Sequence, residues 1–122
     1  MRKILLLLIL SIMFACDDDL TQDEEAAVLQ SMRQEIIDLA KTVDCTDSDD
    51  WSFSPMGAKA CGGPSEYVAY PNSLATEILQ KIEEYTLSNK NFNKKWGVVS
   101  DCALIATPQS ITCVDQEAQL IF

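Results

Sequence analysis

Five cysteines constrain this chain more than any other feature, because an odd number of cysteines cannot all pair within one molecule. Cys16 directly follows an apolar N-terminal run, whereas Cys45, Cys61, Cys102 and Cys113 are spread over the rest of the sequence. If Cys16 has another use, the remaining four can form two disulfide bonds. Each bond adds about 2–4 kcal/mol to the stability of a small exported domain. We therefore expect one compact, disulfide-stapled domain.

The N-terminal segment has the pattern of a secretory signal. Arg2 and Lys3 are followed by an apolar run at residues 4–14, interrupted only by Ser11. As a helix this run would be about 16 Å long, roughly half of the ~30 Å hydrocarbon layer of a bilayer. The pattern therefore indicates a signal peptide and disfavours a transmembrane anchor.

The end of this run resembles the lipobox of bacterial lipoproteins. Met13-Phe14-Ala15-Cys16 places a large apolar residue and a small residue ahead of the cysteine, although Phe14 is bulkier than usual. The resemblance implies that residues 1–15 are removed and that Cys16 is lipidated, which would anchor the protein to a membrane. The alternative is an ordinary signal peptide, with Cys16 as a further disulfide-forming cysteine.

The mature chain would be strongly acidic. Loss of Arg2 and Lys3 leaves 7 basic residues against 19 acidic ones, a net charge of −12. Such a surface repels nucleic acid and anionic headgroups, so we expect neither as a partner. Residues 16–22 are predicted to be an acidic tether, and Asp17-Asp18-Asp19 resembles the surface-export signal of Bacteroidetes-type lipoproteins. We expect anchoring at the outer membrane, on the cell surface or alternatively on its periplasmic face.

Two amphipathic helices are predicted in the single domain at residues 23–122. Thr21 and Glu24 have the spacing of a capping box, and the first helix should cover residues 23–43. Asn72 or Ser73 should cap the second helix, which Gly97 should end. The asparagines near its C-terminus could fray the last turns. The expected inward side chains are Leu29, Met32, Ile36, Leu39 or Ala40, and Val43 in the first helix, and Leu74, Ile78, Ile82, Tyr85 and Phe92 or Trp96 in the second.

Short extended segments complete an α+β fold, with both helices packed on one face of a small antiparallel sheet. Residues 51–54 alternate large apolar and small polar side chains and should form a strand that Pro55 ends, and residues 66–70 are a second extended stretch. Residues 110–114 and 119–122 should form a hairpin that pairs with residues 51–54 and buries the C-terminus. Of the three possible connectivities, this pairing favours Cys45 with Cys113 and Cys61 with Cys102.

A wider set of motifs resembles a group of small lipoproteins of Bacteroidetes-type bacteria that have no established activity. The motifs are Lys59-Ala60-Cys61-Gly62-Gly63-Pro64, Tyr67, Ala69-Tyr70, Tyr85, Phe92-Asn93, Trp96-Gly97, Ser100-Asp101-Cys102 and a final Cys113. The resemblance implies a lipid-anchored, disulfide-bonded secreted domain. The turn at residues 115–117 departs from it, because the group has a tighter turn of the Asn-Gly type there.

No motif predicts a reaction or a cofactor. The chain has no histidine, which excludes histidine-based triads and histidine-ligated zinc. The acidic loop at residues 47–50 lacks the glycine and distal glutamate of an EF-hand, and the Gly62-Gly63 turn is more typical of a bend than of an anion site. We predict a non-catalytic binding or accessory module for a protein or glycan ligand.

Three alternatives stay open. The first is a proteinase inhibitor whose exposed loop lies between Cys102 and Cys113 and carries Thr107-Pro108-Gln109. The second is an enzyme of an unrecognised class, and the third is a purely structural subunit of the envelope.

A basic cluster, Lys90, Lys94 and Lys95, either complements the helix dipole or docks an acidic partner.

Overall fold

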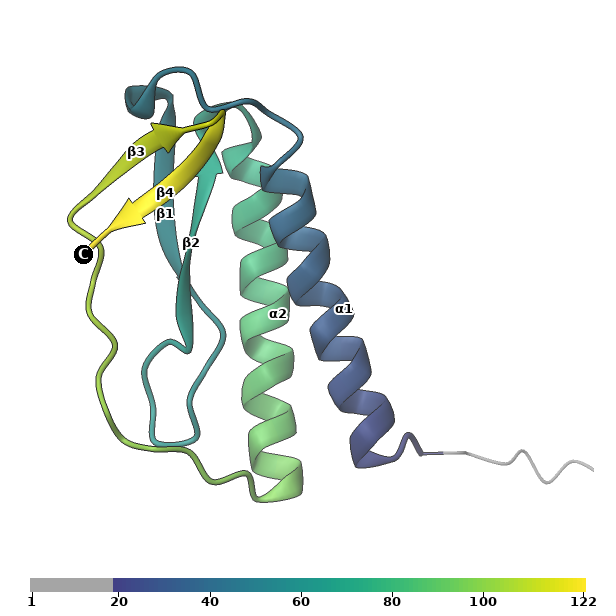
Figure 1. Ribbon diagram of the computed structural model, residues 1–122. Helices are drawn as coiled ribbons and strands as arrows, with labels where there is room; N and C mark the ends of the chain where they lie inside the picture. Colours follow the sequence, from purple (N-terminus) through teal and green to yellow (C-terminus); the bar gives the residue numbers. More distant parts are fainter. Residues whose placement is uncertain (1–18) are drawn as a thin grey trace, which may run out of the picture.

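The computed structural model describes residues 19–122, and it has the predicted α+β architecture (Figure 1). Two long antiparallel helices lie side by side and cover one side of a two-stranded sheet. A second two-stranded sheet, the C-terminal hairpin, crosses in front of the first. The elements in chain order are α1 (Gln22–Ala40), η1 (Ser48–Asp50), β1 (Trp51–Met56), β2 (Glu66–Pro71), η2 (Asn72–Leu74), α2 (Ala75–Trp96), β3 (Ser110–Val114) and β4 (Glu117–Ile121).

Helix α1 begins as the sequence predicts and ends earlier. The Thr21 side chain accepts a hydrogen bond from the Glu24 amide, and the Glu24 carboxylate accepts one from the Thr21 amide. The helix ends at Ala40 rather than at residue 43. The hydroxyl of Thr42 donates to the carbonyl of Leu39, and this local bond takes up one of the carbonyls that the last turn leaves unpaired.

Helix α2 has the predicted end but a different start. Gly97 ends it in the left-handed conformation, with φ +59°. No side chain caps its start, because the chain enters α2 through the short 3-10 turn η2. The Asn72 side chain is used elsewhere: it accepts a hydrogen bond from the Ser52 hydroxyl and donates to the Asp49 carbonyl. The helix is therefore aligned by contacts with the strand rather than by a cap.

The strand pairing differs from the prediction. β1 pairs with β2 in antiparallel register, with Trp51 opposite Pro71 and Met56 opposite Glu66, and the hairpin forms a sheet of its own. Local pairing has the smaller loop-closure cost, which favours the nearer partner. Pro55 does not end β1, since a strand that is paired along one edge tolerates proline.

The core lies between the two helices and one face of β1–β2. Its buried residues are Ile36, Ala40, Met56, Val68, Tyr70, Ile78, Ile82 and Tyr85, and the partly buried Leu29, Met32, Leu39, Leu74 and Ala75 pack around them. The stripes predicted for both helices thus contribute most of the core. An ion pair at its edge joins α1 to β2, where the Arg33 guanidinium donates to both carboxylate oxygens of Glu66 at 2.6 and 2.7 Å.

The aromatic residues of β1 do not face the helices. By the register, Trp51 and Phe53 lie on the opposite face from Val68 and Tyr70, toward the hairpin. Phe53 meets the ring of Tyr67 edge-on, with the centroids 6.2 Å apart. The predicted burial of the C-terminus is wrong, because Phe122 is 63% exposed and lies beyond the last paired residue of the hairpin.

Candidate functional site

The candidate site is the segment at residues 98–109, which we call the anchored loop. It connects α2 to β3 without any helix or strand and returns along the molecule from the end of α2 to the hairpin (Figure 1). Loops of this length without secondary structure are uncommon in compact domains, and they are usually either functional or disordered. Contacts at both ends of the anchored loop hold it in one place.

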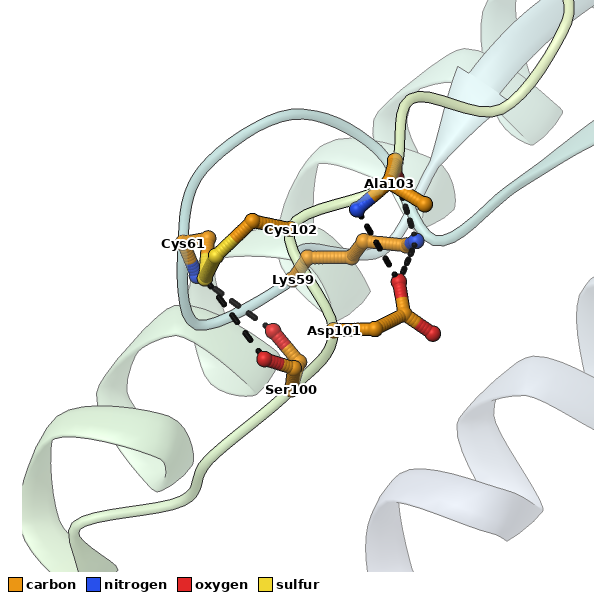
Figure 2. The surroundings of a disulfide bond; sticks show 6 residues. All are labelled: Lys59, Cys61, Ser100, Asp101, Cys102 and Ala103. Carbon is orange, nitrogen blue, oxygen red and sulfur yellow. Dashed lines mark hydrogen bonds and ion pairs between the residues drawn. A yellow bond between two sulfur atoms is a disulfide. The ribbon is translucent and has the colours of Figure 1, made fainter.

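A disulfide bond makes the first attachment. Cys102 is bonded to Cys61, which lies in the connection between β1 and β2, and their Cα atoms are 5.5 Å apart (Figure 2). The amide of Cys61 also donates to the hydroxyl of Ser100 at 3.4 Å. The bridge therefore fixes the start of the anchored loop to the sheet.

Lys59 strengthens this attachment. Its side chain is only 17% exposed, and its ammonium donates to the Asp101 carboxylate and to the Ala103 carbonyl, each at 2.7 Å (Figure 2). The same carboxylate accepts the amide of Ala103 at 3.2 Å. The hydrogen bond from Lys59, with its positive charge and the Ala103 amide, lowers the pKa of Asp101 below its ordinary value. The carboxylate thus stays charged and holds the backbone on either side of Cys102.

Helix α2 holds the β1–β2 connection that carries Lys59 and Cys61. The amide of Ala58 donates to Asn89 at 2.7 Å, and Asn93 donates to the carbonyl of Ala58 at 2.8 Å. The amide of Gly57 donates to the hydroxyl of Thr86 at 3.0 Å. Two of the asparagines that were expected to fray α2, Asn89 and Asn93, instead satisfy the backbone of this connection, and α2 continues to Trp96.

A second set of contacts fixes the end of the anchored loop. Thr107 and Tyr67 of β2 share a hydrogen bond between their hydroxyls at 3.2 Å, and Pro108 is buried. The amide of Gln109 donates to the carbonyl of Ile121 at 2.7 Å. The loop is thus attached at Cys102–Ala103 and again at residues 107–109.

Between these attachments, Leu104 and Ala106 are exposed and Ile105 is partly buried. The Leu104 side chain is 93% exposed, the highest value among the large apolar residues that the structure describes. Within residues 19–122, the backbone amides and carbonyls of residues 104–106 make no hydrogen bond. A protein backbone normally pairs such groups with protein or water. This span therefore offers a partner both unpaired backbone and a large apolar side chain.

The second disulfide bond fixes the hairpin that follows the loop. Cys45 and Cys113 are joined with their Cα atoms 5.3 Å apart, and the amide of Cys45 donates to the carbonyl of Gln116 at 2.8 Å. The cysteines pair as the sequence favoured. The pairing of residues 51–54 with the hairpin, which was expected to bring these cysteines together, does not occur, because β1 and the hairpin belong to separate sheets.

A shallow cavity of about 560 Å³ lies beside the β1–β2 connection. Gly62 and Gly63, both with positive φ, form part of its lining together with Lys90 and Lys94 of α2. Lys95 points elsewhere and pairs with Glu25, which also accepts a hydrogen bond from the Trp96 indole. Within the described chain, Lys90 and Lys94 form no ion pair.

The loop at residues 47–50 has a local structural role. The Asp47 carboxylate caps η1 by accepting the Asp49 amide at 2.9 Å. From residue 19 onward, no cluster of three or more Asp, Glu or Cys side chains has the arrangement of a metal site.

Most of the residues that attach the loop had no role that the sequence patterns could assign. Lys59, Asn89, Asn93 and Tyr67 act through contacts between distant parts of the chain. One signal was available: Lys59 lies two residues before Cys61 and Asp101 directly before Cys102, so the disulfide brings opposite charges together. The predicted lipidation site, Cys16, lies outside the described residues.

None of the helices formed by residues 19–122 combines the length and apolarity needed to cross a membrane. Comparisons of the chain with protein-family models, with curated proteins and with solved structures found no match. The resemblance to Bacteroidetes-type lipoproteins therefore stays a prediction from the sequence.

Proposed function

We propose that this protein is a non-catalytic, lipid-anchored binding or accessory module of the bacterial cell envelope, and that it contacts its ligand through residues 104–106 of the anchored loop. The observation that carries the proposal is the attachment of the loop at both ends around an exposed centre. A loop that is already ordered loses little conformational entropy when it binds, so rigid attachment favours affinity. Binding residues in general concentrate on loops that a rigid scaffold positions.

A binding role is favoured over catalysis by how the reactive groups of the site are used. Cys61 and Cys102 are consumed in a disulfide, and the Asp101 carboxylate is occupied by Lys59 and by the Ala103 amide. Each group stabilises the backbone of the loop, and none of the three is placed as a nucleophile or a general base. Assays of the full chain against generic hydrolase substrates test this part, and turnover that one carboxylate or serine substitution abolishes would contradict it.

The envelope attachment rests on the sequence around Cys16, and it has its own test. Mass spectrometry of the membrane-extracted protein should find a mature N-terminus at Cys16 that carries the lipid. Cys16→Ser should release the protein from membranes or leave it as an unprocessed precursor. An unmodified N-terminus at another position would contradict the lipid anchor.

Protease treatment of intact cells tests the location of the module. Loss of the domain would place it on the cell surface and restrict its partner to an external protein or glycan. Protection of the domain would place it on the periplasmic side.

The role of the loop in binding is tested by affinity capture with the full chain purified in detergent. Leu104→Asp should abolish retention of the partner, because it places a charge at the centre of the exposed span. Val99→Asp is the matched control, since Val99 is 91% exposed and lies ahead of both attachments. A partner retained equally by both variants would show that binding occurs at another surface.

A further inference from the structure

The geometry points to a specific class of partner. We infer that residues 102–107 form the inhibitory loop of a proteinase inhibitor, with Leu104 entering the primary specificity pocket of an endopeptidase that accepts large apolar side chains. This inference rests on the proposed function and names the partner of the same loop.

The backbone at this site suits a proteinase cleft. Peptides commonly bind to other proteins as an added strand, which requires backbone donors and acceptors that are free. Residues 104–106 have such groups, since none of them is hydrogen-bonded within the described chain. Neighbouring side chains leave Leu104 93% exposed and cover Ile105 only in part. A cleft can therefore reach the backbone and Leu104 together.

The attachments hold the loop in one conformation, and this rigidity distinguishes an inhibitor from a substrate. Proteinase–inhibitor complexes are among the tightest known, and their interfaces move little on binding. Lys59 holds the carbonyl of Ala103 directly before Leu104, and Tyr67 holds the hydroxyl of Thr107 three residues after it. The span can thus occupy a cleft without first becoming ordered, which lowers the entropic cost of binding.

The disulfide bonds would also retain both products of a cleavage. Hydrolysis of the bond between Leu104 and Ile105 adds one water, giving a carboxylate at Leu104 and an ammonium at Ile105. The first end stays two residues from Cys102, which is bonded to Cys61. The second end belongs to the fragment that contains Cys113, which is bonded to Cys45. Both fragments would therefore remain in one molecule, and the hydrogen bond between Tyr67 and Thr107 would hold the second end near the first, so that the reverse reaction would compete with release.

The side chain at position 104 determines which proteinase is inhibited. An apolar primary pocket, as in chymotrypsin, accepts leucine, whereas the pocket of trypsin holds an aspartate that selects lysine or arginine. A cleft of the apolar kind would bury a side chain that the free protein leaves in water, and this burial favours the complex.

The experiment uses the full chain purified in detergent, with chymotrypsin and trypsin as probes. The native protein should inhibit chymotrypsin and be cleaved only slowly after Leu104. Leu104→Gly should weaken this inhibition about 100-fold, the size expected for a central anchor of an interface. Leu104→Lys should lose inhibition of chymotrypsin and gain inhibition of trypsin. Val99→Lys, at an equally exposed position, should leave both values unchanged.

Three results would overturn the inference. They are no inhibition by the native protein, rapid cleavage after Leu104 as in an ordinary substrate, and an equal loss of inhibition in the Val99→Lys variant. Denaturant unfolding of each variant shows that its fold is intact. If the capture experiment still retains a partner through Leu104 while chymotrypsin is not inhibited, the inhibitor assignment fails and the binding module stands.

Discussion

The two faces of the β1–β2 sheet are stabilised in different ways. On the helix face, Ile78 is 0% exposed and Ile36 and Met56 are 1% exposed, so apolar burial provides the stability. On the other face Trp51 is buried, but β3 and β4 contain no buried residue, and two disulfide bonds fix the hairpin and the anchored loop. The first region is a core, and the second is a layer that the core supports.

This difference shows how a small domain can present an exposed loop. An apolar layer of this size would have to bury its large side chains in order to stay in place. Covalent attachment removes that requirement, because a disulfide constrains the unfolded chain whatever side chains lie nearby. Leu104 can therefore be exposed although its backbone is fixed on both sides.

The largest expected effect comes from the core. Ile78→Ala removes buried methyl groups at a position with no exposed area, so it should lower the free energy of unfolding by about 4 kcal/mol. Urea unfolding measures this loss. Leu87→Ala on the same helix is the control: Leu87 is 58% exposed, and its loss should stay within about 0.5 kcal/mol. Equal losses in the two variants would contradict the assignment of the core.

The second prediction removes the attachment of the loop. Cys61→Ser together with Cys102→Ser should lower the free energy of unfolding by about 3 kcal/mol. It should also make residues 98–109 sensitive to limited proteolysis while the helices persist, because only the hydrogen bonds made by Lys59 and Ser100 then hold the start of the loop.

The other bridge provides the matched control. Cys45→Ser together with Cys113→Ser should cost a similar amount of stability and loosen the hairpin, whereas the start of the anchored loop stays protected by Cys61–Cys102. Identical cleavage patterns in the two double variants would show that the bridges do not act on separate segments.

The third prediction concerns the hairpin turn. Asp115 and Gln116 both have positive φ, 49° and 66°, in a two-residue turn that joins β3 to β4. Turns of this kind favour Asn-Gly or Asp-Gly, and a side chain at such φ values is strained. Gln116→Gly should therefore raise the free energy of unfolding by about 1 kcal/mol in a urea titration. Gln119→Gly, within β4, should lower it, and stabilisation by both changes would contradict the turn assignment.

Patterns within single segments predicted the core well. The spacing of Ile78, Ile82 and Tyr85 placed them inward because a helix repeats every 3.6 residues, and the capping box at Thr21 fixed the start of α1. The partner of β1 was not predictable in this way. The alternation at residues 51–54 shows that one face is buried, but it carries no information about which strand lies beside it.

The anchored loop was the least predictable region, since its order depends on side chains from distant elements. Asn89 and Asn93 appear in the sequence only as weak helix formers, and in the structure they fix the backbone of Ala58. The apolar Leu104 gives no sign of its exposure, because sequence hydrophobicity predicts burial. The inhibitory loop was expected between Cys102 and Cys113 at Thr107-Pro108-Gln109, but these residues attach the loop, and the exposed large side chain is that of Leu104.

The smallest expected effect concerns the polar attachment of the loop. Lys59 lowers the pKa of Asp101 below the ordinary value of 3.8, so the carboxylate is more acidic in the folded protein than in the unfolded chain. The stability that the pair contributes is therefore present above about pH 4, and it is lost as the pH falls through the lowered pKa.

NMR titration of the Asp101 carboxyl carbon should give a midpoint below 3.8 in the native protein. Lys59→Met keeps the apolar stem of the side chain and should raise the midpoint toward its ordinary value, with the Ala103 amide as the remaining cause of a lowered pKa. Because Asp101 is exposed, the stability difference between the two proteins should be small at neutral pH, and it should disappear as the pH falls through the lowered pKa. A native midpoint at or above 3.8 would show that Lys59 does not hold this end of the loop in solution.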